Sequence, residues 1–398
     1  MIQKLTFGRG LLFILVSPVF AVSHLAIAAA ASPITHIKHK RPVESSYRVP
    51  TFADSTLDDI TVDDEPIVRQ AAVTALGRYN GSVVAIDPSN GRILTIVNQK
   101  LTFSAGFIPC STIKPVIALA ALKEGFVTRD AVIHVSRRKS LSLTEAIAHS
   151  NNKYFEELGR RMGFETVASY ARMLGLGELS GYEIPEEQPG TVPNEPPKRG
   201  GVARMSSFGE GIQMTPLQLG ALASTIANGG TLYYLQYPRT IESKENFEPR
   251  IKRTFELDSQ IGDVREGMLA AVLHGTARRS YISDDEQASG KTGSCSDQGT
   301  RIGWFVSFAD QVNPKIVLVI LMRGQKRIVQ GPMAAGIAGR IYRQLHDENY
   351  FSQNHAEAGV QPLVSFTGRL PSPRGLKTPI LLMDAITKTD IPAEKSSY

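Results

Sequence analysis

Residues 108–125 read IPCSTIKPVIALAALKEG, and the rest of the chain is organised around this stretch. Ser111 and Lys114 lie three positions apart, a spacing that places both side chains on one face of a helix. The run 116–122 is apolar almost all round, which is typical of a helix buried in a core. We therefore expect a buried helix that is open to a cleft only at its N-terminal end and is ended by Gly125.

A serine and a lysine in this arrangement can act as a nucleophile and its base. The hydroxyl becomes a good nucleophile only when a neighbour takes its proton, and a neutral lysine amine can do so. Burial and the positive end of a helix both disfavour a charged lysine, so the start of a buried helix suits such a base. The same spacing also occurs by chance on surface helices, so Ser-x-x-Lys alone does not separate the two interpretations.

Two more polar motifs follow, Ser150-Asn151-Asn152 and Lys291-Thr292-Gly293. Taken alone, the first would be an ordinary helix cap. The second could end a phosphate-binding loop, but that loop needs a glycine where Asp285 stands.

Three motifs in this order resemble the penicillin-recognising serine enzymes, the superfamily of penicillin-binding proteins and serine β-lactamases. Stretches around the motifs are similar to the transpeptidase domain of penicillin-binding proteins; they are residues 81–94, 209–218, 226–230 and 303–305. The resemblance covers residues 67–346.

The resemblance implies a chemical role for the first two motifs. Lys114 would take the proton of Ser111, which would attack the carbonyl of a D-Ala-D-Ala peptide or of a β-lactam and form an acyl-enzyme. Ser150 would relay a proton to the leaving nitrogen. Asn152 would hold Lys114 and the substrate's amide side chain, because an amide offers both donors and an acceptor.

The resemblance assigns the third motif to substrate binding. Lys291 and Thr292 would bind the substrate carboxylate, and Gly293 would let the substrate backbone approach closely. The backbone N–H groups of Ser111 and Ser294 would form the oxyanion hole. On a strand, Lys291 and Gly293 share one face and Thr292 takes the other, unless the strand twists at the glycine.

The two cysteines of the sequence, Cys110 and Cys295, flank this implied oxyanion hole. If both N–H groups point at one oxyanion, the neighbouring residues lie close together, and a disulfide needs Cα atoms roughly 4.4 to 6.8 Å apart. We expect a Cys110–Cys295 disulfide, with two buried free thiols as the alternative.

The order of expected elements predicts an α+β fold. Residues 82–87 and 92–98 form a β-hairpin joined by Pro-Ser-Asn-Gly, and 288–294, 302–309 and 316–322 form an antiparallel meander. Helices are expected at 67–76, 142–148, 153–162, 165–174, 260–274 and 333–345, and another opens at Thr215-Pro216. As in the resembled family, we expect a five-stranded antiparallel sheet flanked by helices, with a helical lobe beside it.

The two ends of the chain differ from this domain. Residues 1–31 combine basic residues, an apolar run and a small-residue end, so they are a signal peptide or a membrane anchor. Either outcome exports the rest of the chain, to the periplasm or the outer face of the cytoplasmic membrane. We expect a polar linker at 32–66, the transpeptidase domain at 67–346 and a flexible C-terminal tail at 347–398.

Composition argues against other classes of function. The 44 basic and 38 acidic residues give a formal charge of +6, and no basic stripe interleaved with aromatic residues is present, so no nucleic-acid partner is expected. A mildly basic surface would suit an anionic envelope or polymer. The eight histidines contain no His-Glu-x-x-His and no dinucleotide fingerprint follows a strand, so we expect neither a metal nor a cofactor.

The leading hypothesis is a serine D,D-transpeptidase that acts on peptidoglycan stem peptides and is acylated by β-lactams. A D,D-carboxypeptidase shares the acyl-enzyme and differs only in transferring it to water. A serine β-lactamase is suggested by the cysteine pair, although class A enzymes have Asp where Asn151 stands. A β-lactam sensor or wall-binding protein without turnover is the non-enzymatic alternative.

Overall fold

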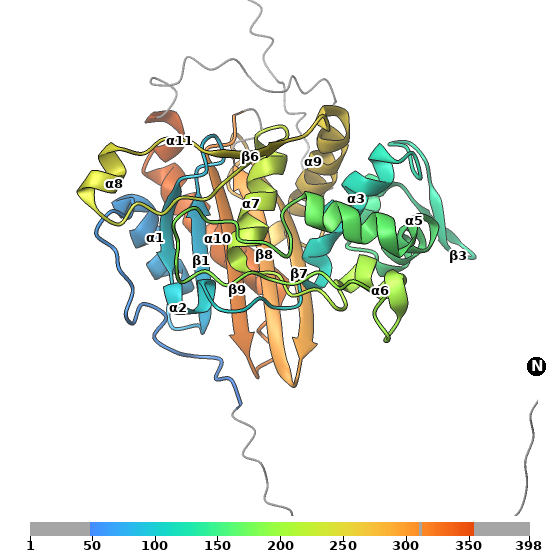
Figure 1. The fold of residues 1–398 in the computed structure, drawn as a ribbon, viewed down its shortest axis with the longest axis horizontal. Helices are drawn as coiled ribbons and strands as arrows, with labels where there is room; N and C mark the ends of the chain where they lie inside the picture. The colour runs from blue at the N-terminus through green and yellow to red at the C-terminus, as the bar shows by residue number, and fades with distance from the viewer. Residues whose placement is uncertain (1–47, 310–312, 354–398) are drawn as a thin grey trace, which may run out of the picture. The chain divides into compact units, whose positions relative to one another are not determined.

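The computed structural model describes residues 48–309 and 313–353, which form a five-stranded antiparallel sheet packed between helices (Figure 1). The strand order is β2-β1-β9-β8-β7, so the third motif lies on an edge strand. The strands are β1 (Gly81–Ile86), β2 (Ile93–Val97), β7 (Ala288–Asp297), β8 (Thr300–Ala309) and β9 (Ile316–Gly324).

The central strands are buried on both faces, because side chains alternate between two hydrophobic clusters. On β9, Val317, Val319 and Leu321 belong to the cluster shared with the helical lobe. The alternate positions Leu318 and Ile320 belong to the cluster shared with the terminal helices. Helices therefore have to cover both faces of the sheet.

The covering helices are α1 (Pro66–Leu76), α7 (Pro216–Ala227), α9 (Asp258–Leu273) and α10 (Gly331–Asp347). Helices α1 and α10 pack on one face, and α7 packs on the other. The helical lobe lies beside the β7 edge in Figure 1. Its helices are α3 (Lys114–Lys123), α4 (Leu143–Ala148), α5 (Asn152–Met173) and α6 (Gly201–Phe208).

The expected hairpin, meander and main helices are confirmed, with differences of detail. Thr215 caps α7 in a reciprocal capping box with Gln218, which satisfies two backbone N–H groups at the helix start. The two helices expected at 153–174 are continuous in α5 except at Gly163, whose left-handed φ of 77° marks the kink. The segment expected to be one helix carrying Ser111 and Lys114 begins as a tighter 3₁₀ turn, η1 (Cys110–Ile113), before α3.

Short elements were not predicted from the sequence, because three to five residues carry too little periodicity. Two small hairpins pair β3 (Ile133–Ser136) with β4 (Lys139–Leu141) and β5 (Thr231–Tyr233) with β6 (Ile251–Thr254). The remaining short helices are α2 (Gln99–Thr102), α8 (Ile241–Glu245), η2 (Arg278–Ser280) and α11 (Tyr350–Gln353).

The prediction of a polar linker reaching residue 66 is wrong for its described part. Asp59 accepts hydrogen bonds from the backbone N–H groups of Asn98 and Gln99 and pairs with Arg69. Asp64, whose pKa is raised by burial, pairs with the same arginine. These carboxylates are therefore not a solvated charge cluster; they fasten the segment before α1 to the domain.

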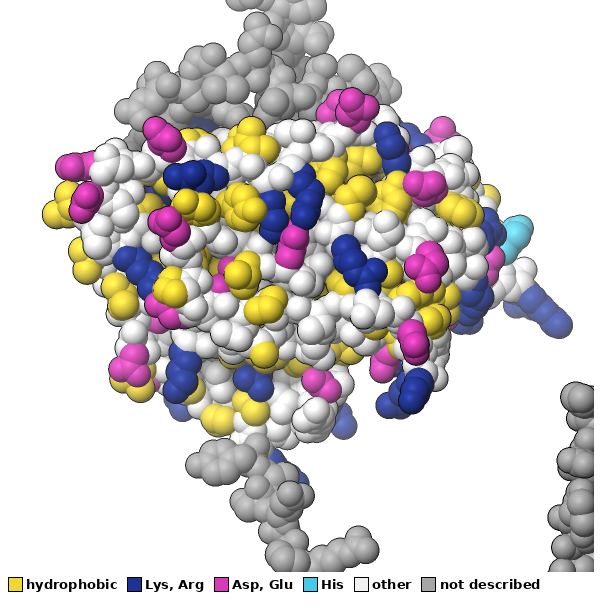
Figure 2. All heavy atoms as spheres, viewed as in Figure 1, with side chains coloured by type: hydrophobic (Ala, Val, Ile, Leu, Met, Phe, Trp, Pro, Cys, Tyr) yellow, Lys and Arg dark blue, Asp and Glu magenta, His cyan; other side chains and the backbone are white. Residues whose placement is uncertain are grey.

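Residues 348–353 also differ from the predicted tail, because α11 follows α10 and Phe351 is buried in the core. The predicted signal peptide or anchor, the linker up to residue 47 and the tail from 354 lie outside the described residues. No helix in 48–309 or 313–353 has the length and apolar character needed to span a membrane. On the face in Figure 2, basic and acidic side chains are interspersed.

Candidate active site

The nucleophile segment is held between the sheet edge and the lobe. Ser111 lies in the 3₁₀ turn η1 and is 8 % exposed, whereas Lys114, the first residue of α3, is fully buried. Every residue of α3 up to Ala121 is buried, as expected for a helix that is apolar on all sides. Only the N-terminal end of this helix can therefore meet a substrate.

Lys114 lies at the centre of a hydrogen-bond network. Its Nζ is 3.0 Å from Ser111 Oγ, 2.7 Å from Asn152 Oδ1, and 2.8 and 3.0 Å from the carbonyl oxygen and Oγ of Ser150. Burial lowers the pKa of Lys114 well below the 10.5 of an ordinary lysine, and the positive charge of Lys291 lowers it further. A neutral amine at this position can accept the Ser111 proton.

The second motif connects α4 to α5, as predicted. Ser150 has a left-handed φ of 53°, which turns the chain between the two helices. Asn151 is the N-cap of α5, its Oδ1 accepting the N–H of Tyr154. The capping interpretation therefore holds for Asn151, while Asn152 faces Lys114.

The third motif brings a second buried amine to Ser150. Lys291 Nζ lies 2.9 Å from Ser150 Oγ and 3.0 Å from the carbonyl oxygen of Thr292. Burial lowers the pKa of Lys291 from 10.5 to about 7. Ser150 Oγ thus lies between two amines, and the four side chains form a continuous path from Ser111 through Lys114 and Ser150 to Lys291 along which a proton can move.

The rest of β7 faces the nucleophile turn closely. A Cβ on Gly293 would lie 3.0 Å from the Pro109 carbonyl oxygen and 3.1 Å from Thr112 Cγ2, so a side chain here would push the strand and the turn apart. As an edge strand, β7 also has backbone groups not paired with β8. Ser294 follows, and its hydroxyl accepts the N–H of Gly331 at the start of α10.

Thr276 is a neighbour of the site that no sequence pattern indicated. Its hydroxyl lies 2.7 Å from that of Thr292, and its N–H donates to the Ala148 carbonyl oxygen at 3.0 Å. It therefore links the third motif to the end of α4, next to the second motif. No local signal could have marked it, because Thr276 lies 128 residues after Ala148 along the chain.

Trp304 supports the site through packing and a hydrogen bond. It is fully buried on β8, opposite Gly293, and its indole N–H donates to the Ile108 carbonyl oxygen at 3.0 Å. Trp304 is therefore a packed strand residue that also forms a hydrogen bond to the segment before Ser111.

A disulfide joins Cys110 to Cys295, with Cα atoms 5.7 Å apart, so the expected pairing is present in the structure. It connects the turn η1 to β7, through the residue just before Ser111 and the residue just after Ser294. Closing a loop of 185 residues restricts the unfolded chain, which by the chain-entropy relation stabilises the fold by up to about 5 kcal/mol.

We predict that protein from an oxidising compartment has no free thiol under denaturing, non-reducing conditions. Reduction, or the double change Cys110→Ser and Cys295→Ser, should lower the free energy of unfolding by as much as about 5 kcal/mol in denaturant titrations. Two free thiols in the unreduced protein would contradict the bridge.

The fold and this geometry define a protein in which a buried lysine amine contacts a serine hydroxyl beside the edge strand of an antiparallel sheet. The sequence model of the penicillin-binding protein transpeptidase domain matches residues 81–346. The chain belongs to this family.

Individual relatives agree with the family. Stage V sporulation protein D of Bacillus subtilis is 27 % identical, over 71 % of this chain and 52 % of its own length. The probable peptidoglycan D,D-transpeptidase PbpC of Pseudomonas aeruginosa is 25 % identical, over 77 % of this chain and 60 % of its own length. The chain thus spans only about half of the length of the curated relatives that it matches.

Solved structures support the fold. The transpeptidase domain of Burkholderia pseudomallei penicillin-binding protein 3 superposes with a TM-score of 0.61 at 21 % identity, covering 75 % of this chain and 97 % of that chain. The D,D-transpeptidase domain of an Eggerthella lenta peptidoglycan glycosyltransferase gives 0.58 at 19 % identity, covering 71 % and 82 %.

Proposed function

We propose that this protein is a serine D,D-transpeptidase that crosslinks peptidoglycan stem peptides ending in D-Ala-D-Ala and is acylated by β-lactams. The observation that carries the proposal is the contact of the buried Lys114 amine with Ser111 Oγ at 3.0 Å, next to Ser150, Asn152 and Lys291. The substrate would be met outside the cytoplasm, in the periplasm or at the outer face of the membrane.

In the proposed acylation, Lys114 accepts the hydroxyl proton as Ser111 Oγ bonds to the carbonyl carbon. The backbone N–H groups of Ser111 and Ser294 stabilise the oxyanion. When the carbon–nitrogen bond breaks, Ser150 passes a proton to the leaving D-alanine nitrogen and is reprotonated from a neighbouring lysine. The acceptor amine then attacks the acyl carbon, the bond from that carbon to Ser111 Oγ breaks, and the proton that the amine loses returns to Ser111 Oγ through Lys114.

Three residues bind the substrate in this proposal. Asn152 Oδ1 already accepts from Lys114, so its side-chain N–H₂ remains to bind the substrate's amide. Lys291 in its ammonium form attracts the carboxylate, together with Thr292. Gly293 leaves room for the substrate backbone to lie along the edge strand, as a further strand would.

The test has two measurements on the purified protein. A fluorescent penicillin is added, and both the label on the protein and the loss of free drug are followed. A stem pentapeptide is then supplied with a D-amino acid acceptor, and release of D-alanine and formation of the exchanged peptide are measured. Persistent label with exchange supports the proposal. Rapid loss of free drug would identify a β-lactamase, and hydrolysis of the pentapeptide without exchange would identify a carboxypeptidase. Persistent label with neither hydrolysis nor exchange would identify a sensor. Each of these three outcomes would overturn the proposed transpeptidase function.

The pKa of about 7 for Lys291 predicts a pH dependence of acylation. Raising the pH through 7 removes the ammonium charge that attracts the substrate carboxylate, so the second-order rate constant with a carboxylate-bearing β-lactam should fall on the alkaline side. Lys291→Arg keeps its charge, so its profile should stay flat to higher pH, although its absolute rate is lower. Rate constants measured from about pH 6 to about 9 check this; parallel profiles for the two proteins would assign the alkaline limb to another group.

A further inference from the structure

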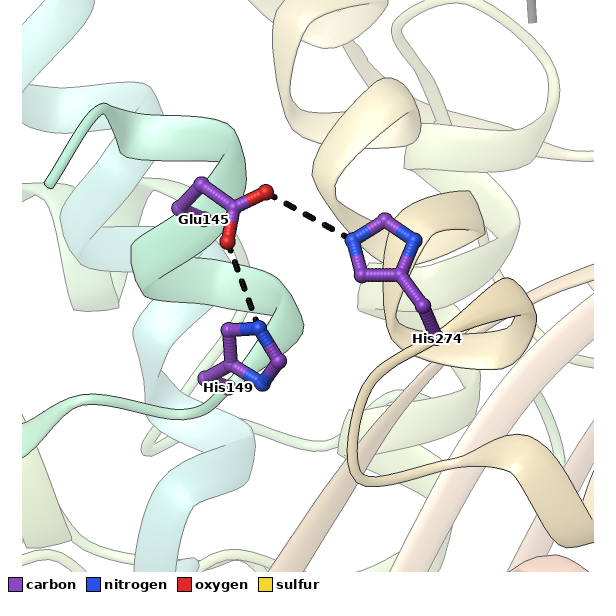
Figure 3. A group of neighbouring side chains, drawn as sticks. All are labelled: Glu145, His149 and His274. Atoms are coloured by element: carbon purple, nitrogen blue, oxygen red, sulfur yellow. Dashed lines mark ion pairs between the residues drawn. The ribbon is translucent and has the colours of Figure 1, made fainter. Parts of the chain in front are cut away.

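Glu145, His149 and His274 form a cluster of three metal-ligating side chains that the proposed reaction does not use (Figure 3). Glu145 lies in the first turn of α4, His149 is the C-cap residue of the same helix, and His274 caps the C-terminal end of α9. Figure 3 shows both imidazole rings directed at the carboxylate, each toward a different oxygen. The distances are 3.2 Å from His149 Nε2 to Glu145 Oε2 and 3.5 Å from His274 Nε2 to Oε1.

The geometry allows all three side chains to bind the same ion. One ligand atom from each residue lies within 4.8 Å of the other two, a spacing that small rotations of the side chains can close around one ion. The two rings are tilted, with centroids 5.8 Å apart, so they are not stacked against each other. A cation between the three side chains would therefore be bound by two imidazole nitrogens and one carboxylate oxygen.

The surroundings of the cluster allow an ion to enter. The three side chains are 35 % to 45 % exposed, so water can reach the site and complete the coordination shell. Their backbones are held by local structure, because the N–H of the C-cap residue His149 donates to the Glu145 carbonyl oxygen and the Thr276 N–H donates to the Ala148 carbonyl oxygen. The ends of α4 and α9 are therefore held together before any ion binds.

We propose that Glu145, His149 and His274 bind one divalent transition-metal ion, of which zinc is the best match, and that the ion joins α4 to α9. Two imidazoles and a carboxylate are ligands that zinc binds in a tetrahedral site with water in the fourth position. Calcium and magnesium prefer shells made only of oxygen and are disfavoured by the two nitrogens.

An ion at this position would connect two parts of the active site. His149 directly precedes Ser150, and His274 is two residues before Thr276, whose hydroxyl contacts Thr292. The ion would thus fasten the second motif to the segment that supports the third. The sequence did not indicate this metal site, because no short spacing connects His274 with Glu145 and His149, and His274 reaches α4 only through the packing of α9.

The test titrates zinc chloride into untagged, EDTA-stripped protein by calorimetry. We expect one ion per chain and a rise in the melting temperature with zinc. Glu145→Gln and His274→Ala should each weaken zinc binding at least about tenfold, since each removes one of three protein ligands. Cobalt in place of zinc should give the visible absorption of a tetrahedral site.

His346→Ala is the matched control, because His346 also faces two carboxylates, Asp285 and Asp347, but is not part of the cluster. This variant should bind zinc as the unaltered protein does. Circular dichroism checks that all variants are folded. Absence of zinc binding, or binding that Glu145→Gln and His274→Ala leave unchanged, would overturn the proposal and leave the cluster as carboxylate–histidine ion pairs.

Discussion

Treatment with a labelled penicillin should leave a covalent adduct on Ser111, and Ser111→Ala should reduce the labelling rate by at least about 1,000-fold. The Lys114 amine at the start of α3 lies 3.0 Å from Ser111 Oγ, and the turn η1 that carries Ser111 packs beside the edge strand β7. An alanine keeps the turn and removes only the oxygen that forms the ester. Mass spectrometry of the proteolysed adduct locates the label.

Ser296→Ala is the control for this experiment. Ser296 is exposed on β7, just past the disulfide, and it takes no part in the proposed chemistry. Its substitution should leave labelling unchanged. An adduct on another peptide, or full labelling of Ser111→Ala, would remove Ser111 as the nucleophile.

Replacement of Lys114 should abolish acylation almost as completely. Lys114→Ala and Lys114→Arg should both lose at least about 1,000-fold in the acylation rate, because the alanine has no base and a guanidinium does not give up its proton at usable pH. Lys114→Met separates loss of the base from loss of packing, since methionine fills a similar volume without an amine. The rate is measured with a fluorescent penicillin under single-turnover conditions.

The stability of these variants is a second readout. Because burial holds the pKa of Lys114 well below the 10.5 of an ordinary lysine, this amine is less stable in the fold than in the unfolded chain at neutral pH and so destabilises the fold. Lys114→Met should therefore melt at the same temperature as the unaltered protein or above it. Lys123→Ala, at the exposed end of α3, should keep the full acylation rate. Normal acylation by Lys114→Met would mean that another group is the base.

Much of the site could be predicted because its parts are local patterns. Ser111 and Lys114 are one helical turn apart, and the cap at Asn151 and the strand at Lys291 follow from neighbouring residues. The role of Asn152 could be distinguished from that of Asn151 only by the resemblance to the family, since both residues are amides at the start of a helix. The linker prediction failed because composition does not reveal that Asp59 meets backbone N–H groups of Asn98 and Gln99.

The sequence by itself determined the order of the hairpin, the buried nucleophile helix and the meander, because the burial of apolar periodic segments leaves few alternatives. Only the tertiary structure decided which distant groups meet. Lys291 reaches Ser150, Thr276 reaches Thr292, and His274 reaches Glu145 because α9 packs against α4 and β7. Such contacts depend on the three-dimensional positions of whole elements, and no spacing along the chain encodes them.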